Sequence, residues 1–392
     1  MSHQLISHSP DLKRLRDEGY EIEVKGGYLI ANHIPYVNSS REIKYGKLIS
    51  ELTLKNNKET APPSTHVINF CGEHPCNKDG SIITQIQHAT ATQTLAEGVT
   101  INYSFSNKPP SGYPNYYEKI RRYADMISAP AKSLDKNVTE KTFKVVPDED
   151  VESVFQYMDT SSSRANINGL NSKFHGLKIA IVGLGGTGAY ILDLLAKTPV
   201  SEIHLYDGDE FLQHNAFRSP GAASNEQLGL KQKKSDYYTN IYSNMHKKII
   251  PHHVYLDGKN LWELDKMNYV FICVDKNSVR SDLTKYLLSA KIPFIDVGLG
   301  VNVVDDFLIG TLRVTTGTPS KNDHLPVRIS GEDNLNNEYA TNIQIADLNC
   351  LNAVLAVIKW KKMVGFYQDL EQEHHSTYSI NVSQLLNEDI TT

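Results

Sequence analysis

The chain has 392 residues, a formal net charge of −5, 22% charged residues and 40% hydrophobic residues. This length is enough for two domains with separate cores, and the charge balance indicates neither a nucleic-acid partner nor an anionic membrane partner. The first residues lack the apolar core of a signal peptide, and no apolar run approaches the ~20 residues that span a bilayer. Four cysteines make a poor disulfide framework, so a reduced, cytoplasmic protein is predicted.

The first part of the chain alternates between strand-like and turn-like stretches. Residues 20–37 have the pattern of a hairpin around Gly26 and Gly27, and residues 42–54 and 65–72 follow as further strands. A polar, Pro-rich stretch at 107–114 then leads into a helical pattern at 116–135. This order predicts a smaller α+β domain over residues 1–158.

A regular alternation of strands and helices follows a linker-like stretch at 159–173. Strands are expected at 178–183, 202–209, 269–275 and 292–298, and helices between them at 188–198 and 280–290. Such alternation is typical of a mostly parallel sheet covered by helices. It predicts an α/β, Rossmann-like domain over residues 159–392.

The segment KIAIVGLGGTGAY (178–190) joins an apolar strand to a helix start through a cluster of glycines: Gly183, Gly185, Gly186 and Gly188. The cluster satisfies G-x-G-x-x-G, in which bare backbone approaches a phosphate at a helix N-terminus. Asp207 ends the next strand, where it can hydrogen-bond a ribose hydroxyl, and Asp209 belongs to the same expected nucleotide site. This fingerprint fits a dinucleotide, a nucleoside triphosphate or a tight turn without ligand.

Cationic residues after Asp207 favour a triphosphate. Asn215 and Arg218 follow it, then a lysine cluster (Lys231, Lys233, Lys234), and the next strand ends at Asp275. A dehydrogenase needs no such cations beside a pyrophosphate already held by a helix N-terminus. Reaction at an α-phosphorus needs them on the developing charge and on the leaving pyrophosphate. It also needs a carboxylate for Mg²⁺, a role that Asp275 suits at the carboxyl end of its strand.

From about residue 160 to about residue 365, the chain resembles the ThiF/MoeB and ubiquitin-activating adenylyltransferase family. The matching segments are GLGGTG, DGDEFLQHNAFR, the lysines before SDYY, and DKNSVR. The resemblance implies that ATP and Mg²⁺ are used to adenylate a C-terminal carboxylate, usually the Gly-Gly tail of a ubiquitin-like protein. It further implies that Asp207 holds the ribose, that Asn215, Arg218 and one lysine stabilise the phosphates, and that Asp275 binds Mg²⁺.

The resemblance leaves a choice among three lysines for the catalytic one, and it gives an upstream arginine two interpretations. Lys234 is favoured because KSDYY best matches the family's stretch, while Lys231 and Lys233 stay open. Arg164 resembles an arginine that family members donate across a homodimer, although a linker arginine is the alternative. The resemblance thus implies a homodimer, and the apolar helical pattern at 351–360 is a candidate for its interface.

The cysteines depart from the family pattern. Many relatives transfer the acyl group to a cysteine in the loop after the strand at 292–298, but residues 298–340 contain none. A thioester on that loop is therefore excluded by composition. The chain also lacks the two C-x-x-C pairs that often bind zinc in relatives.

An N-terminal segment, NFCGEHPCNKDGSII (69–83), resembles the HPN…GSIC stretch of ubiquitin-conjugating enzymes. Ile83 or Thr84 takes the place of the active cysteine, which implies an inactive, RWD-like binding module. Alternatively, Cys76 beside His74 is an acyl acceptor. Two further interpretations remain. One is a metal site formed by Cys71, His74 and Cys76, and the other is a purely structural role for the Cys76 thiol.

The predicted function is ATP-dependent activation of a ubiquitin-like protein ending in glycine, with an N-terminal module that recruits the substrate or a conjugating enzyme. The fused architecture suggests a bacterial conjugation operon of the kind linked to antiviral defence. Three alternatives stay open: activation of a sulfur carrier for cofactor synthesis, an NAD-dependent oxidoreductase, and a non-catalytic scaffold.

Overall fold

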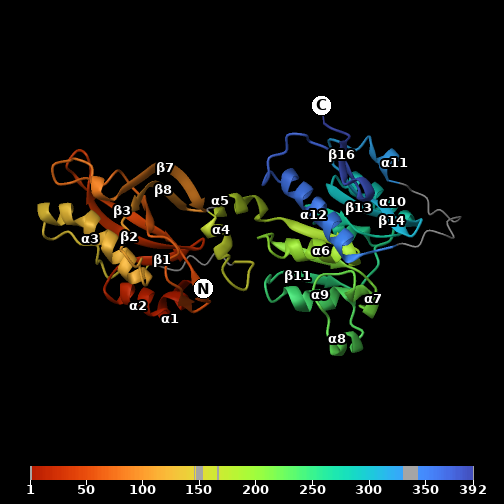
Figure 1. Ribbon diagram of the computed structural model, residues 1–392, viewed down its shortest axis with the longest axis horizontal. Helices are drawn as coiled ribbons and strands as arrows, with labels where there is room; N and C mark the ends of the chain where they lie inside the picture. The colour runs from red at the N-terminus through yellow and green to blue at the C-terminus, as the bar shows by residue number, and fades with distance from the viewer. Residues whose placement is uncertain (1, 145, 147–152, 166, 330–342, 392) are drawn as a thin grey trace. The chain divides into compact units, whose positions relative to one another are not determined.

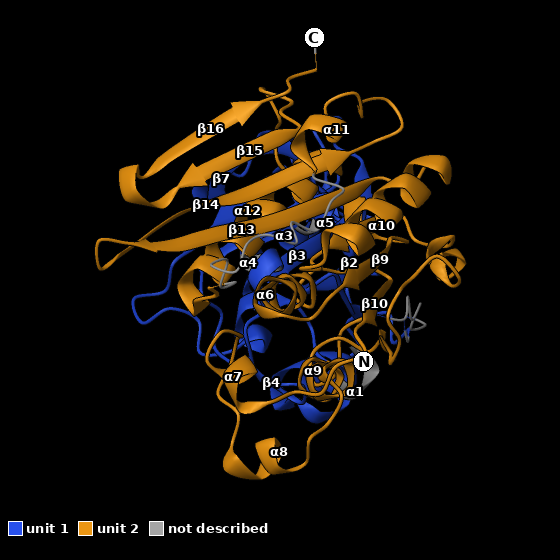
Figure 2. Ribbon diagram, turned by 90° about the vertical axis from the view of Figure 1, so that its right-hand side faces the viewer, with its two compact units in different colours: residues 1–153, 157–172 blue, residues 154–156, 173–392 orange. Residues whose placement is uncertain are grey.

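The computed structural model describes residues 2–144, 146, 153–165, 167–329 and 343–391 (Figure 1). Its contacts divide the chain into unit 1, residues 1–153 and 157–172, and unit 2, residues 154–156 and 173–392 (Figure 2). Each unit has its own sheet and hydrophobic core. No helix in the described part of the chain combines the length and apolar character that a bilayer crossing requires.

Unit 1 is built on an antiparallel sheet with strand order β1-β2-β3-β6-β8-β7. Its helices are α1 (Ser2–His8), α2 (Pro10–Asp17), α3 (Tyr116–Leu134), α4 (Thr160–Arg164) and α5 (Asn168–Asn171), and a 3-10 turn is η1 (Thr84–Ile86). Its strands are β1 (Ile22–Lys25), β2 (Tyr28–Val37), β3 (Ile43–Glu51), β4 (Leu54–Asn56), β5 (Glu59–Thr60), β6 (Val67–Cys71), β7 (Gln87–Ala96) and β8 (Val99–Ser106).

Helix α3 closes the core of unit 1. It begins after Asn115, whose side chain accepts a hydrogen bond from the Glu118 amide at 2.9 Å and so caps the helix. Its apolar face, which includes Ile120, Tyr123 and Ile127, is buried against β2 and β3. The predicted hairpin, the next strands and this helix are therefore present, and the α+β class of the N-terminal part is confirmed.

Unit 2 is built on a mixed sheet with strand order β11-β10-β9-β12-β13-β14-β15-β16, parallel up to β13 and antiparallel beyond it. Its strands are β9 (Lys178–Val182), β10 (Glu202–Tyr206), β11 (Ile249–His252), β12 (Tyr269–Ile272), β13 (Phe294–Val304), β14 (Phe307–Gly317), β15 (His375–Ser379) and β16 (Gln384–Glu388). Its helices are α6 (Gly186–Leu195), α7 (Gln213–Ala216), α8 (Asn225–Gly229), α9 (Lys234–Tyr242), α10 (Asn277–Ser289), α11 (Leu325–Arg328) and α12 (Ala346–Met363), with 3-10 turns η3 (Leu261–Leu264) and η4 (Ile380–Val382).

The α/β, Rossmann-like class is confirmed, with four strands beyond those predicted. Strand β9 is a nearly continuous buried apolar run, as expected of a central parallel strand covered on both faces. Strands β11, β14, β15 and β16 were not predicted, and the last three make the sheet mixed; Figure 2 shows β13 to β16 side by side.

Helix α12 packs on α6 and on β13 of its own unit. Ala353, Ala356 and Trp360 are fully buried there. The buried side chains of the apolar pattern at 351–360 are thus explained by the core of unit 2, while a dimer interface on this helix stays a prediction.

The topology gathers the predicted site residues at one edge of this sheet. Strand β9 lies between β10 and β12, parallel to both, so the carboxyl ends of all three strands meet. Gly183 follows β9, Asp207 follows β10, and Asp275 lies just beyond β12. Ligands of open α/β sheets bind at such an edge.

Candidate functional site

Three of the four glycines in the cluster are required by the protein's own packing. Gly183 has φ +92°, and a Cβ there would stand 2.7 Å from the carbonyl oxygen of Cys273. A Cβ on Gly188 would stand 2.0 Å from the Gly183 carbonyl oxygen, and one on Gly186 would overlap the Asn349 side chain. These positions let strand β9, helix α6 and helix α12 approach one another closely.

Gly185 is different, because no described protein atom crowds it. Its φ is −68°, and the nearest atom to an added Cβ is Gln344 Oε1, at 4.0 Å. It is the N-cap of α6, it has no side chain to cap the helix, and it lines a cavity together with Gly186 and Thr187. A bare backbone and open amides at a helix N-terminus form a cradle for an anion.

The turn after β10 joins this cradle to two carboxylates. Asp207 is buried, and its oxygens accept hydrogen bonds from the amides of Leu184 (2.7 Å) and Asp209 (2.8 Å), which holds the glycine loop against β10. Burial raises the pKa of Asp207. Asp209 is half-exposed and accepts a hydrogen bond from the Tyr255 hydroxyl at 2.5 Å.

Of the three candidate lysines, Lys234 is the one that faces these carboxylates. Its Nζ lies 2.7 Å from Asp209 Oδ2 and 3.8 Å from Asp207 Oδ2, and the residue is 6% exposed. Burial acts to raise the pKa of Asp209, but the hydrogen bonds from Lys234 and Tyr255 outweigh it and hold that pKa below its usual value. Lys233 donates to the Gly208 carbonyl oxygen at 2.8 Å, and Lys231 is exposed.

Asn215 and Arg218 carry polar atoms that the protein leaves unpartnered. Asn215 is 1% exposed, and its Oδ1 accepts a hydrogen bond from the Leu212 amide at 2.8 Å. Asn215 Nδ2 and Arg218 Nε are both buried, and neither has a hydrogen-bond partner among the described residues. Unpaired buried donors are costly, so two of them on one short segment after Asp207 fit the binding of an anionic ligand.

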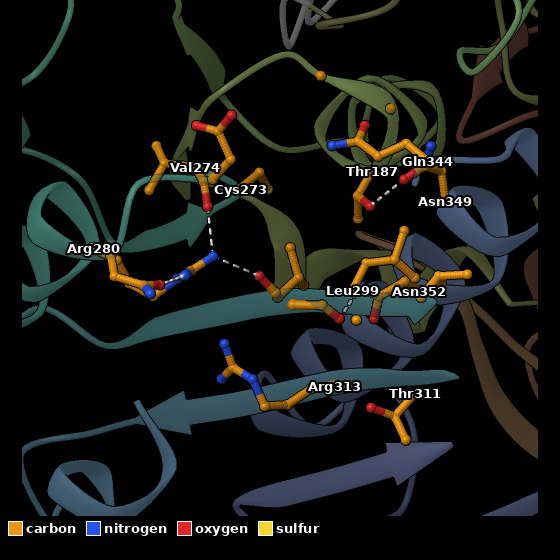
Figure 3. Close-up of a pocket in the computed structure, with 18 of the residues that line it drawn as sticks. Thr187, Cys273, Val274, Arg280, Leu299, Thr311, Arg313, Gln344, Asn349 and Asn352 are labelled. Carbon is orange, nitrogen blue, oxygen red and sulfur yellow. Dashed lines mark hydrogen bonds between the residues drawn. The ribbon is translucent and has the colours of Figure 1, made fainter. Parts of the chain in front are cut away.

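A cavity of about 520 Å³ lies along the glycine loop (Figure 3). Gly185, Gly186 and Thr187 line one wall, β13 and β14 line another, and the exposed Asp275 lies at its edge. This volume is within the usual range for small-ligand sites, about 300–1,000 Å³. Among the described residues, no group of three or more His, Cys, Asp or Glu side chains is placed to hold a metal ion. Asp275 therefore fits a cation such as Mg²⁺ only where phosphate oxygens and water complete its shell.

Asn349 on α12 was not predicted, yet it ties the site together. Its Oδ1 accepts a hydrogen bond from Thr187 Oγ1 at 2.9 Å, drawn in Figure 3. Its Nδ2 donates to the Arg218 carbonyl oxygen at 3.3 Å. One buried amide thus links the N-terminus of α6 to the loop that carries Arg218.

The remaining predicted residues belong to unit 1 or lie outside the described residues. The side chain of Arg164 lies outside the described residues. So does the stretch 330–340 of the cysteine-free loop at 298–340. Cys76 is 1% exposed, its Sγ donates to the His74 carbonyl oxygen at 3.3 Å, and burial raises the pKa of its thiol. These features disfavour a reactive thiolate. Cys71, His74 and Cys76 are described and form no metal-binding group, so that alternative is wrong.

Comparisons with known proteins match the two parts of the chain separately. Residues 152–303 match the ThiF family, and residues 10–160 match a domain of unknown function, DUF6791. The adenylyltransferase and sulfurtransferase UBA4 of Saccharomyces cerevisiae is 31% identical over 141 residues, 36% of this chain and 30% of UBA4. The chain thus spans less than a third of the length of the curated relatives it matches.

Two solved structures are similar at low identity. MccB of E. coli is 17% identical with a TM-score of 0.48, over 70% of this chain and 85% of the MccB chain. PaaA is 15% identical with a TM-score of 0.47, over 75% of this chain and 94% of the PaaA chain.

Proposed function

We propose that this chain, which carries a ThiF-family domain at residues 152–303, adenylates the C-terminal carboxylate of a ubiquitin-like carrier protein with ATP. The family match confirms the resemblance inferred from the sequence. The observation that best supports the proposed activity is the pair of unpartnered buried donors, Asn215 Nδ2 and Arg218 Nε, on the segment that Asn349 joins to the N-terminus of α6. Each of these donors costs free energy while it stays unpaired, and an anionic ligand would pair both.

In the proposed reaction, an oxygen of the carrier's carboxylate attacks the α-phosphorus of ATP in line. The new bond joins that oxygen to phosphorus, the bond from phosphorus to the bridging oxygen breaks, and pyrophosphate leaves with its electrons. Amides from Gly185 to Gly188 hold the phosphates, while Arg218 and Lys234 offset the charge that develops. No general base is needed, because the carboxylate is already ionised at neutral pH.

Asp275 is the residue proposed to hold Mg²⁺. Bound there, the ion would offset negative charge on the phosphates. A single carboxylate suits this ion, which usually keeps several waters and takes phosphate oxygens as further ligands. The Asp207–Asp209 turn is proposed to hold the ribose, with Asp209 as the more accessible carboxylate.

The cavity beside the glycine loop is proposed to receive the carrier's tail. Gly300 of β13 leaves it open, since a Cβ there would meet only Thr311 Oγ1, at 3.9 Å. Gln344 Oε1 is buried at the opposite wall with no hydrogen-bond partner among the described residues. The uncrowded backbone at Gly300 leaves room for an extended peptide of small residues. The unpaired Gln344 oxygen can accept a hydrogen bond from one of that peptide's amides.

Several finer parts of the prediction remain proposals. Activation of a sulfur carrier shares the adenylation step and differs only in the carrier and in the product's fate. A homodimer, a conjugating-enzyme partner, an RWD-like role for residues 1–158 and a place in antiviral defence also remain proposals. An NAD-dependent oxidoreductase would leave Asn215, Arg218 and Lys234 without a role.

The test is pyrophosphate exchange into ATP, with Mg²⁺ and candidate ubiquitin-like proteins that end in glycine. Exchange should require the carrier's intact C-terminus, and Asp275→Asn or Arg218→Ala should abolish it while melting temperatures stay near that of the parent chain. Leu385→Ala, an exposed residue on β16 at the end of the sheet, is the control and should exchange normally. Full exchange in both site variants would refute the assignment.

A further inference from the structure

A buried carboxylate, Asp296 of β13, lies between two arginines in the cavity wall. Its side chain is 0% exposed, with Arg280 Nε 2.8 Å from Oδ1 and Arg313 Nη2 2.6 Å from Oδ2. Two guanidinium groups face one carboxylate here, so this part of the wall carries an excess of positive charge. Buried ion pairs are often no more stabilising than apolar packing of the same size, so fold stability alone is a weak reason for this arrangement.

Arg280 connects Asp296 to the loop that carries Asp275. Besides its bond to Asp296, it donates through Nη2 to the Val274 carbonyl oxygen at 2.5 Å and through Nη1 to Asn277 Oδ1 at 2.6 Å. These acceptors lie on either side of Asp275 along the chain, and Figure 3 shows the bond to Val274. A single guanidinium therefore contacts the loop on both sides of Asp275, and Asp296 and the Val297 carbonyl oxygen, 3.4 Å from Nη2, orient it.

Arg313 completes the cluster from β14, beyond the residues that match the ThiF family. Its guanidinium lies across Gly298, where a Cβ would stand 2.8 Å from Nη2. Nη1 donates to Thr315 Oγ1 at 2.8 Å, and that hydroxyl lies 2.9 Å from His375 Nδ1 on β15. The antiparallel strands added to the parallel sheet thus support the loop of Asp275 through one chain of polar contacts.

We propose that Arg313 and Asp296 are positioning residues that hold the Asp275 loop for metal binding through Arg280. Without Arg313, one oxygen of Asp296 loses its cation, and Asp296 then holds Arg280 through a carboxylate that no second cation orients. The inference rests on the proposed function, because it takes Asp275 as the residue that meets Mg²⁺.

The experiment measures ATP binding to the full chain by calorimetry, with Mg²⁺ and with EDTA. The ratio of the two dissociation constants is the metal's contribution, and Asp275→Asn should bring it to about one. Arg313→Gln should lower the ratio about tenfold, as is typical when a group supporting a metal ligand is lost. Its dissociation constant in EDTA should stay within about twofold of the parent value. Thr315→Val, a milder change that removes one bond to Arg313, should lower the ratio by a smaller factor.

Lys359→Gln is the matched control for lost stability. Lys359 is buried in unit 2 and pairs with Asp369 at 2.9 Å and Glu373 at 3.4 Å, so its loss should lower the melting temperature without changing the ratio. If Asp275→Asn removes the metal's contribution but Arg313→Gln and Thr315→Val keep it, the positioning role is refuted and the proposed function stands. If the parent chain binds no ATP, or Asp275→Asn keeps the full contribution, the proposed site fails and this inference with it.

Discussion

Lys119 of unit 1 and Lys234 of unit 2 are both buried, and the two differ in what they contact. Lys119 of unit 1 is 0% exposed, and its Nζ donates to Ser50 Oγ at 2.9 Å and to the Thr65 carbonyl oxygen at 3.0 Å. Lys234 of unit 2 faces the carboxylates of Asp209 and Asp207, beside the open glycine turn. Burial of a charged group is therefore not enough to identify a functional site. The groups that it contacts, and an anion-binding turn beside it, are better indicators of function.

The largest effect expected from this comparison is on catalysis. Lys234→Met should reduce carrier-dependent pyrophosphate exchange by about 100-fold or more, as when one preorganised donor to a developing charge is removed. Lys119→Met should leave exchange per folded molecule within about twofold of the parent rate, because its neighbours are structural. Equal losses in the two variants would erase the distinction between the lysines.

The glycines allow the same contrast within one loop. Gly188→Ala places a Cβ against the Gly183 carbonyl oxygen and should destabilise unit 2 by about 1–3 kcal/mol, the usual cost of overpacking. Gly185→Ala meets no described protein atom closer than 4.0 Å, so the melting temperature should barely change while ATP binding weakens. Thermal unfolding and calorimetry on both variants test this, and unchanged ATP binding by Gly185→Ala would argue against the cradle.

The smallest effect expected is a pH dependence of stability from Lys119. Burial lowers the pKa of Lys119 from 10.5 to about 8, so between these values the unfolded chain binds more protons than the folded one. The free energy of unfolding should therefore rise with pH, by about 1 kcal/mol between pH 7 and pH 9 from this group. Lys119→Met should remove that increment in urea titrations at the two pH values. An identical pH dependence in parent and variant would contradict the depressed pKa.

The local features of unit 2 could be predicted because they are written in short stretches of sequence. Strand β9, the glycine turn and the order of Asp207, Asn215, Arg218 and Asp275 each depend on neighbours close in the chain. The choice of Lys234 over Lys231 and Lys233 needed the sequence resemblance, and the contact with Asp209 now supports it geometrically.

The parts that could not be predicted depend on contacts between residues distant in the chain. Asn349 reaches the glycine turn from α12, 162 positions from Thr187, and no local pattern indicates that contact. Asp296 did leave a signal that was not used, since it is a charged residue within the apolar run IPFIDVG. Its partner Arg313 could not be predicted, because the contact depends on the pairing of β14 with β13.

The most direct test of the central claim is calorimetry of the purified chain with ATP and Mg²⁺, run beside NAD. Saturable ATP binding that Arg218→Ala weakens at least about tenfold, with no binding of NAD, is the predicted result. NAD binding without ATP binding would contradict the account, because the glycine turn would then hold a dinucleotide, and Asn215, Arg218 and Lys234 would need another explanation.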